Sequence, residues 1–134
     1  MQIESDERRA PSIFAVLFAK DAMRLGDFYE SVLGAVVLHT EASHVVLQVQ
    51  ERQFVLHAIP EEIARDIVIT SPPAPREEAA IKLIFPVLSI EQATRAAEEG
   101  GGVVYGRVWE SSDARVRDVV DPEGNVFQLS EALR

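Results

Sequence analysis

The sequence contains one order of structural elements twice, and this repeat constrains the fold more than any other feature. Each half is predicted to form a strand, a helix and then three strands. The first copy is expected over residues 12–20, 21–33, 35–41, 44–50 and 53–59. The second copy is expected over residues 80–87, 89–100, 103–110, 114–120 and 126–130. Because two copies of one unit can enclose a single cavity, the repeat also indicates where a shared site lies.

Both helices carry clear start and stop signals. Asp21 can cap the first helix, and Gly34 supplies the left-handed residue that ends it. The residues between them place an apolar stripe on one face: Leu25, Phe28, Tyr29, Val32 and Leu33. The second helix opens with a capping box at Ser89–Gln92, has a face of small alanines and ends in three glycines at 100–102. We expect both helices to lie against sheets.

Composition excludes several classes of protein. The formal net charge of −9 argues against a nucleic-acid binder, which needs a basic face, and favours a neutral or cationic small-molecule ligand. No apolar run is long enough to cross a membrane, and the absence of cysteine excludes disulfides and thiolate metal sites. Residues 1–11 are expected to form a flexible tail without the apolar core of a signal peptide, which favours a cytoplasmic location.

Two segments resemble motifs of a known superfamily. Asp21 followed by Phe28–Gly34, and the closing segment Asp118–Leu129 with its Asp-Pro-Glu-Gly-Asn turn, resemble the vicinal oxygen chelate superfamily. This group contains glyoxalases, bleomycin-resistance proteins and extradiol dioxygenases. The resemblance covers about residues 12–131.

The resemblance implies an α+β fold of two βαβββ modules, whose curled mixed sheets form an open barrel around a cavity. Residues 12–134 would then be one glyoxalase-like domain. Its parts would be module one over 12–60, a proline-rich linker over 61–79 and module two over 80–131. Members of the superfamily are commonly homodimers, so a homodimer is expected here.

The resemblance also implies where a metal would be held, with one ligand on the first and one on the last strand of each module. Those places fall on Phe14, Val55, Lys82 and Gln128. Phenylalanine and valine have no donor atom, and a lysine cation opposes a metal. A shift of two residues would bring in His57 and still leave too few ligands. His39 and His44 flank a turn and are expected to face solvent. The sequence therefore predicts no metal and no other cofactor in the cavity.

Two functions remain open. The first is a binding protein that sequesters a small organic molecule without metal, in a pocket with few polar groups. The residues expected to contact the ligand are Phe14, Val55, His57, Lys82, Trp109 and Gln128, with Val16 beside them. The alternative is a lyase, isomerase or dioxygenase of the same superfamily, in which His57 or Lys82 acts in place of a metal. No catalytic residue can be assigned from the sequence.

Overall fold

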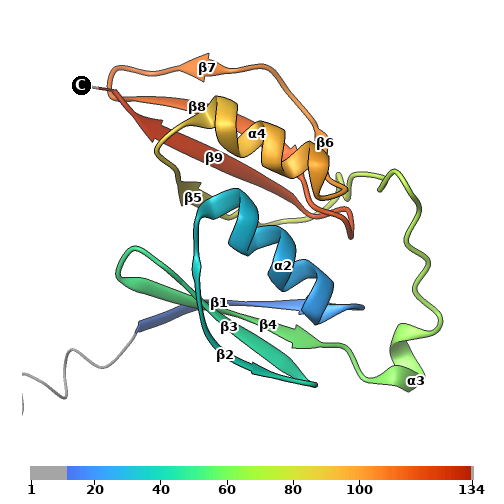
Figure 1. Ribbon diagram of the computed structural model, residues 1–134. Helices are drawn as coiled ribbons and strands as arrows, with labels where there is room; N and C mark the ends of the chain where they lie inside the picture. Colours follow the sequence, from blue (N-terminus) through green and yellow to red (C-terminus); the bar gives the residue numbers. More distant parts are fainter. Residues whose placement is uncertain (1–11, 134) are drawn as a thin grey trace, which may run out of the picture.

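The computed structural model describes residues 12–133, and both copies of the repeat fold as βαβββ modules (Figure 1). The first module consists of β1 (Ser12–Ala19), α2 (Ala22–Leu33), β2 (Val36–Glu41), β3 (His44–Val49) and β4 (Arg52–Ala58). Its sheet has the order β1-β4-β3-β2, in which β1 pairs with β4 in parallel and the other pairs are antiparallel.

The second module repeats this arrangement. It consists of β5 (Ile84–Pro86), α4 (Ile90–Glu99), β6 (Val103–Val104), β7 (Trp109–Glu110), β8 (Ala114–Val120) and β9 (Val126–Ala132). Its sheet has the order β5-β9-β8-β6, with β7 also pairing with β8. The expected α+β class with two modules is confirmed. Within residues 12–133 the strands form two open sheets and no closed barrel.

The sequence signals of the helices act as predicted. The side chain of Asp21 accepts a hydrogen bond from the backbone N–H of Arg24 at 3.1 Å, and Gly34 adopts φ 64° at the end of α2. In α4, the Ser89 hydroxyl accepts from the backbone N–H of Gln92 at 3.2 Å. The predicted apolar stripe of α2 is buried along its whole length.

One hydrophobic core joins the two modules. α2 contacts α4, and Tyr29 of α2 lies at the centre of an aromatic cluster. Its ring centroid lies 5.6 Å from that of Phe54 on β4, 5.7 Å from that of Phe85 on β5 and 5.2 Å from that of Phe127 on β9. Strands of both sheets therefore contribute to one aromatic cluster around Tyr29.

Hydrogen bonds between the segments that carry the resemblance also connect the two modules. The Tyr29 hydroxyl donates to Asp121 Oδ2 at 2.7 Å, and both side chains are buried. The carboxylate of Glu123 accepts from the backbone N–H groups of Lys20 and Asp21, each at 2.7 Å. The residues that carry the resemblance therefore join the end of β1 and the start of α2 to the last hairpin of the chain.

Three expected elements differ in the structure. The strand predicted over 103–110 is interrupted, because residues 105–108 face only two residues of β8 and loop out of the ladder. The strand predicted over 80–87 is reduced to β5, which leaves Lys82 outside it. The linker over 61–79 begins with a four-residue helix, α3 (Glu61–Ala64), before its prolines.

Some expectations concern the ends of the chain or the membrane. The tail expected over residues 1–11 lies outside the described residues, as does residue 134. Among residues 12–133, no helix is both long and apolar enough to cross a membrane.

Candidate ligand-binding site

A cavity of about 430 Å³ lies between β1 of the first module and the second module. The second module contributes the segment 79–83 and the start of β9. The lining is mostly apolar: Phe14, Val16, Leu17, Ile81, Leu83 and Phe127. We call this space the seam cavity. Its volume is in the range of pockets that hold small organic ligands, which run from about 300 to 1,000 Å³.

A smaller, more polar cavity of about 220 Å³ adjoins the seam cavity. The two cavities share three lining residues, Ala79, Ile81 and Val126. The remaining lining residues of the smaller cavity are polar or charged: Arg76, Glu77, Lys82, Tyr105 and Asp118. Together the two spaces can accommodate an elongated molecule with an apolar body and a polar end.

The polar groups of the smaller cavity are already paired. Lys82 Nζ lies 2.8 Å from Asp118 Oδ2, and Gln128 Nε2 donates to Asp118 Oδ1 at 3.2 Å. The Asp118 carboxylate therefore contacts two of the side chains that the sequence analysis predicts in the site, Lys82 and Gln128. Across the cavity, the Tyr105 hydroxyl donates to Glu77 Oε2 at 2.5 Å, and this bond raises the pKa of Tyr105 above its usual value.

Two other expected site residues lie on the sheet of the first module. Val55 and His57 of β4 share the face directed away from α2, while their neighbours Phe54 and Leu56 are buried on the core side. The parallel register places Val55 beside Val16 and His57 beside Phe18. The rings of Phe18 and His57 lie 5.6 Å apart, and Phe18 is 59% exposed.

Trp109 lies apart from the two cavities and from the face of β4 that carries Val55 and His57. It is on β7, which pairs with β8 at the edge of the second sheet, and the guanidinium of Arg107 stands 3.9 Å from its ring centroid. Neither the seam cavity nor its polar neighbour is lined by Trp109. The structure thus gathers Phe14, Val16 and Lys82 around the two cavities, with Gln128 attached through Asp118. It leaves Val55, His57 and Trp109 elsewhere.

Phe14 has a double role in this arrangement. Its ring packs against Phe54 and Phe85 at centroid distances of 6.2 Å each, so it belongs to the margin of the core. The guanidinium of Arg52 covers it at 4.9 Å. Phe14 therefore connects the wall of the seam cavity to the core.

Comparison with known proteins agrees with this architecture. The model of a family described as a glyoxalase-like domain matches residues 14–130. The chain belongs to the glyoxalase-like domain family. It is thereby part of the vicinal oxygen chelate superfamily, as the two motifs indicated. Among functionally curated proteins, none matches the sequence of this glyoxalase-like protein.

Solved structures share its fold at low sequence identity. A glyoxalase/bleomycin resistance protein/dioxygenase family enzyme from Burkholderia phytofirmans PsJN has a TM-score of 0.67 and 19% identity, covering 88% of this chain and 95% of its own. The fosfomycin resistance protein FosX from Mesorhizobium loti has a TM-score of 0.64 and 9% identity, with coverage of 92% and 93%. TioX from Micromonospora sp. ML1 has a TM-score of 0.62 and 16% identity, with coverage of 91% and 99%.

The residues at the superfamily's four metal-ligand places do not suit a metal. Phe14 and Val55 carry no donor atom, and the ammonium group of Lys82 is held by Asp118. Gln128 uses its amide N–H on the same carboxylate, which leaves one amide oxygen as the only neutral donor in the set. The four side chains at the places that the resemblance assigns to metal ligands therefore do not form a suitable ligand set.

Sequence reasoning missed four polar members of the site, Arg76, Glu77, Tyr105 and Asp118. The signal for Asp118 was present, because the hairpin that begins at Val120 opposite Val126 places Asp118 directly opposite Gln128. Counting pairs back from the Asp-Pro-Glu-Gly-Asn turn would have found it. No comparable signal exists for Tyr105, whose hydroxyl bonds to Glu77 in the proline-rich linker.

Proposed function

We propose that this glyoxalase-like protein binds a small organic molecule, with an apolar body in the seam cavity and a polar end at the Lys82–Asp118 pair. The continuity of the apolar and polar cavities is the observation that carries the proposal. Binding without metal at the superfamily's places is supported by the side chains found there. The net charge of −9 favours a cationic or neutral guest over an anion.

We further propose that the protein acts as a homodimer. β1 is an edge strand, and it exposes three large apolar side chains, Ile13, Val16 and Phe18. An exposed apolar edge of this kind is usually covered by a partner or a ligand. A second copy would cover this edge close to the mouth of the seam cavity. A cytoplasmic location fits this role and stays a prediction.

A pair of valine substitutions tests the binding site. A thermal-shift screen of small cationic, neutral and anionic compounds first identifies a ligand of the wild-type protein. Val16→Phe should then weaken its binding at least tenfold, because the larger side chain enters the seam cavity. Val36→Phe is the matched control, since Val36 is similarly exposed on the opposite edge strand, β2, away from the cavity. Equal affinities of the two variants would reject the seam cavity as the site.

Lys82→Met tests the polar end separately. The substitution removes the charge of Lys82 and keeps most of its length, so the affinity for charged ligands should change more than the affinity for neutral ones. The free carboxylate of Asp118 would then favour cations. Equal changes for both kinds of ligand would remove Lys82 from the site. The alternative of a lyase, isomerase or dioxygenase stays a prediction that turnover assays on the identified ligand can test.

A further inference from the structure

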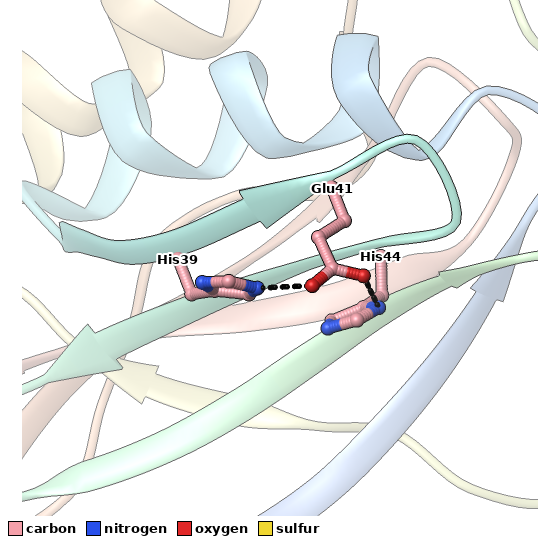
Figure 2. Close-up of side chains that lie close together, drawn as sticks. All are labelled: His39, Glu41 and His44. Atoms are coloured by element: carbon pink, nitrogen blue, oxygen red, sulfur yellow. Dashed lines mark hydrogen bonds and ion pairs between the residues drawn. The ribbon is translucent and has the colours of Figure 1, made fainter.

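Three potential metal ligands converge on the hairpin of β2 and β3, away from the candidate ligand-binding site (Figure 2). His39 Nε2 donates to Glu41 Oε2 at 2.8 Å, and His44 Nδ1 lies 3.9 Å from Glu41 Oε1. One donor atom from each residue lies within 4.8 Å of the other two. We call this group the hairpin triad.

The strand register explains why the hairpin triad forms. Glu41 is paired with His44 across the turn, and His39 is paired with Val46. The register is unbroken from Glu41 back to His39, so His39 and Glu41 face the same side of the sheet as Val46 and His44, and the shift that makes Leu38 an extra residue lies beyond His39. The positions of all three side chains are therefore set by the β ladder, which holds a site more rigidly than a loop does.

The donor set has the chemistry of a zinc-type site. Two imidazole nitrogens and one carboxylate oxygen form a common three-ligand set for Zn²⁺, which also suits Ni²⁺ and Cu²⁺. Tetrahedral bonds of ~2.0–2.1 Å place donor atoms ~3.3 Å apart. The two histidine nitrogens lie 2.8 and 3.9 Å from different oxygens of the Glu41 carboxylate, and one donor atom from each residue lies within 4.8 Å of the other two, so side-chain rotations have to bring the three donors together on one ion.

The electrostatics also favour a cation. Glu41 places a carboxylate oxygen next to each of the two imidazole rings. About half of the His39 and Glu41 side chains is exposed, and an ion can reach them from solvent. The acidic protein as a whole attracts cations to its surface.

We propose that the hairpin triad binds one divalent transition-metal ion of the Zn²⁺ class through His39 Nε2, Glu41 and His44 Nδ1. Three protein ligands leave a fourth position of a tetrahedral ion for water or another small donor. To coordinate the metal, the His39–Glu41 hydrogen bond and the contact between Ser43 Oγ and His44 Nδ1 must be given up. The site lies on β2 and β3, outside the superfamily's metal-ligand places, and goes beyond the proposed function.

His57 offers a matched control. Its ring stacks near that of His44, with centroids 6.2 Å apart and planes 13° apart. Its Nδ1 donates to its own neighbour, the carbonyl oxygen of Ala58, at 3.0 Å. His57 is therefore a nearby exposed histidine on the adjacent strand that does not belong to the triad, and its replacement tests whether any histidine in this region has the same effect.

The experiment titrates the full chain with Zn²⁺ alone, in competition with a chromogenic chelator of known affinity. Wild-type protein should bind one Zn²⁺ per chain, and His39→Gln and His44→Gln should each weaken binding by at least tenfold, while His57→Gln should change it by less than about twofold. Affinity should fall as the solution is made acidic, because protons compete with the metal for its ligands. Titration with Co²⁺ adds a visible absorption spectrum, which should indicate tetrahedral coordination in the wild type and in His57→Gln and should be lost in His39→Gln and His44→Gln.

Two results would overturn the proposal. Wild-type affinity for Zn²⁺ no higher than that of a His39→Gln/His44→Gln double variant would show that the triad is only a hydrogen-bonded group. A loss in His57→Gln as large as that in His39→Gln would place the metal elsewhere on the sheet. Because the titrant is the metal alone, neither result depends on whether the seam cavity binds an organic molecule.

Discussion

At the scale of single residues, Asp121 shows that a motif carboxylate can be purely structural. It is fully buried, and burial raises its pKa despite four hydrogen bonds. The donors are the Tyr29 hydroxyl, the backbone N–H groups of Glu123 and Asn125, and the Asn125 side chain. A carboxylate with all its acceptor sites used has no capacity left for substrate, so its role is to fix the last hairpin against α2.

Tyr29→Phe tests this role at pH 7. The substitution leaves Asp121 buried with one donor fewer, and the free energy of unfolding should fall by about 1–3 kcal/mol. Urea unfolding followed by circular dichroism measures the change. Tyr105→Phe is the control, because it removes an exposed hydroxyl that is bonded to Glu77, and the free energy of unfolding should stay nearly constant. A loss in Tyr29→Phe no larger than that in Tyr105→Phe would contradict the structural role.

Wild type and Tyr29→Phe should also differ in how their stability depends on pH in alkaline solution. Burial, followed by the charge of Asp121, raises the pKa of Tyr29 well above its ordinary value of 10.0. Above pH 10 the unfolded chain therefore releases a proton that the folded protein keeps, and the free energy of unfolding falls as pH rises. Tyr29→Phe lacks this proton, so the stability gap between wild type and variant should narrow between pH 9 and pH 11. A constant gap would show that Tyr29 ionises normally in the folded protein.

At the scale of elements, the three glycines after α4 make room for α2. A Cβ atom on Gly102 would lie 2.6 Å from the carbonyl oxygen of Val120 and 2.9 Å from the ring of Phe28. A Cβ atom on Gly100 would lie 3.1 Å from the same ring. The glycine run therefore ends the helix and also allows Phe28 to pack between α2 and the second module.

Gly102→Ala should destabilise the protein by about 1–3 kcal/mol, since the added methyl group overlaps backbone as well as Phe28. Gly106→Ala is the control, because a Cβ atom there meets nothing within 4 Å, and its free energy of unfolding should stay within about 0.5 kcal/mol of wild type. Thermal or urea unfolding of the two variants makes the comparison. Equal stabilities would mean that the end of α4 can move away from α2 at little cost.

Phe28→Ala tests the other side of this contact. Phe28 is buried to 3% exposure and packs edge-on against Tyr29 and Phe127. Its truncation leaves a cavity in the joint core and should reduce the free energy of unfolding by about 3–5 kcal/mol. Met23→Ala, on the exposed side of the same helix, is a suitable comparison. A loss below about 1 kcal/mol for Phe28→Ala would show that the core does not depend on this ring.

The sequence predicted the order of the helices and strands better than it predicted where a strand is interrupted or ends early. Asp21, Ser89 and Gly34 marked the helix ends because capping is a local interaction that short patterns reveal. The loop-out at 105–108 and the early end of β5 depend on pairing with strands far along the chain, and alternation in one segment carries no information about them. For the same reason, the site was only partly predictable. Alternation can assign residues to the two faces of a strand, but which face meets which cavity depends on the packing of the two modules.

At the scale of the whole molecule, the two sheets share a core on one side and leave their other faces open. On the first sheet, the open face carries Val16, Phe18, Val55 and His57. Figure 1 shows the two helices next to each other, with one sheet lying toward α2 and the other toward α4. The modules thus present their open faces away from the shared core, where a partner can cover them.

A homodimer should therefore be observed in solution. Multi-angle light scattering at micromolar concentration is expected to give twice the chain mass of 14.8 kDa. Phe18→Glu places a charge on the exposed edge strand and should shift the equilibrium toward monomer, whereas Met23→Glu, on the exposed side of α2, should leave the dimer intact. A wild-type protein of single-chain mass at this concentration would refute the dimer.

The hydrogen bonds from Tyr29 to Asp121, and from Lys20 and Asp21 to Glu123, have a consequence for how such chains are recognised. Both motif segments of this sequence contribute contacts between the two repeats. Gln128 is the only one of their residues at a place that the resemblance assigns to a metal ligand. A resemblance that rests on these segments therefore indicates how the two repeats are assembled rather than what the protein binds.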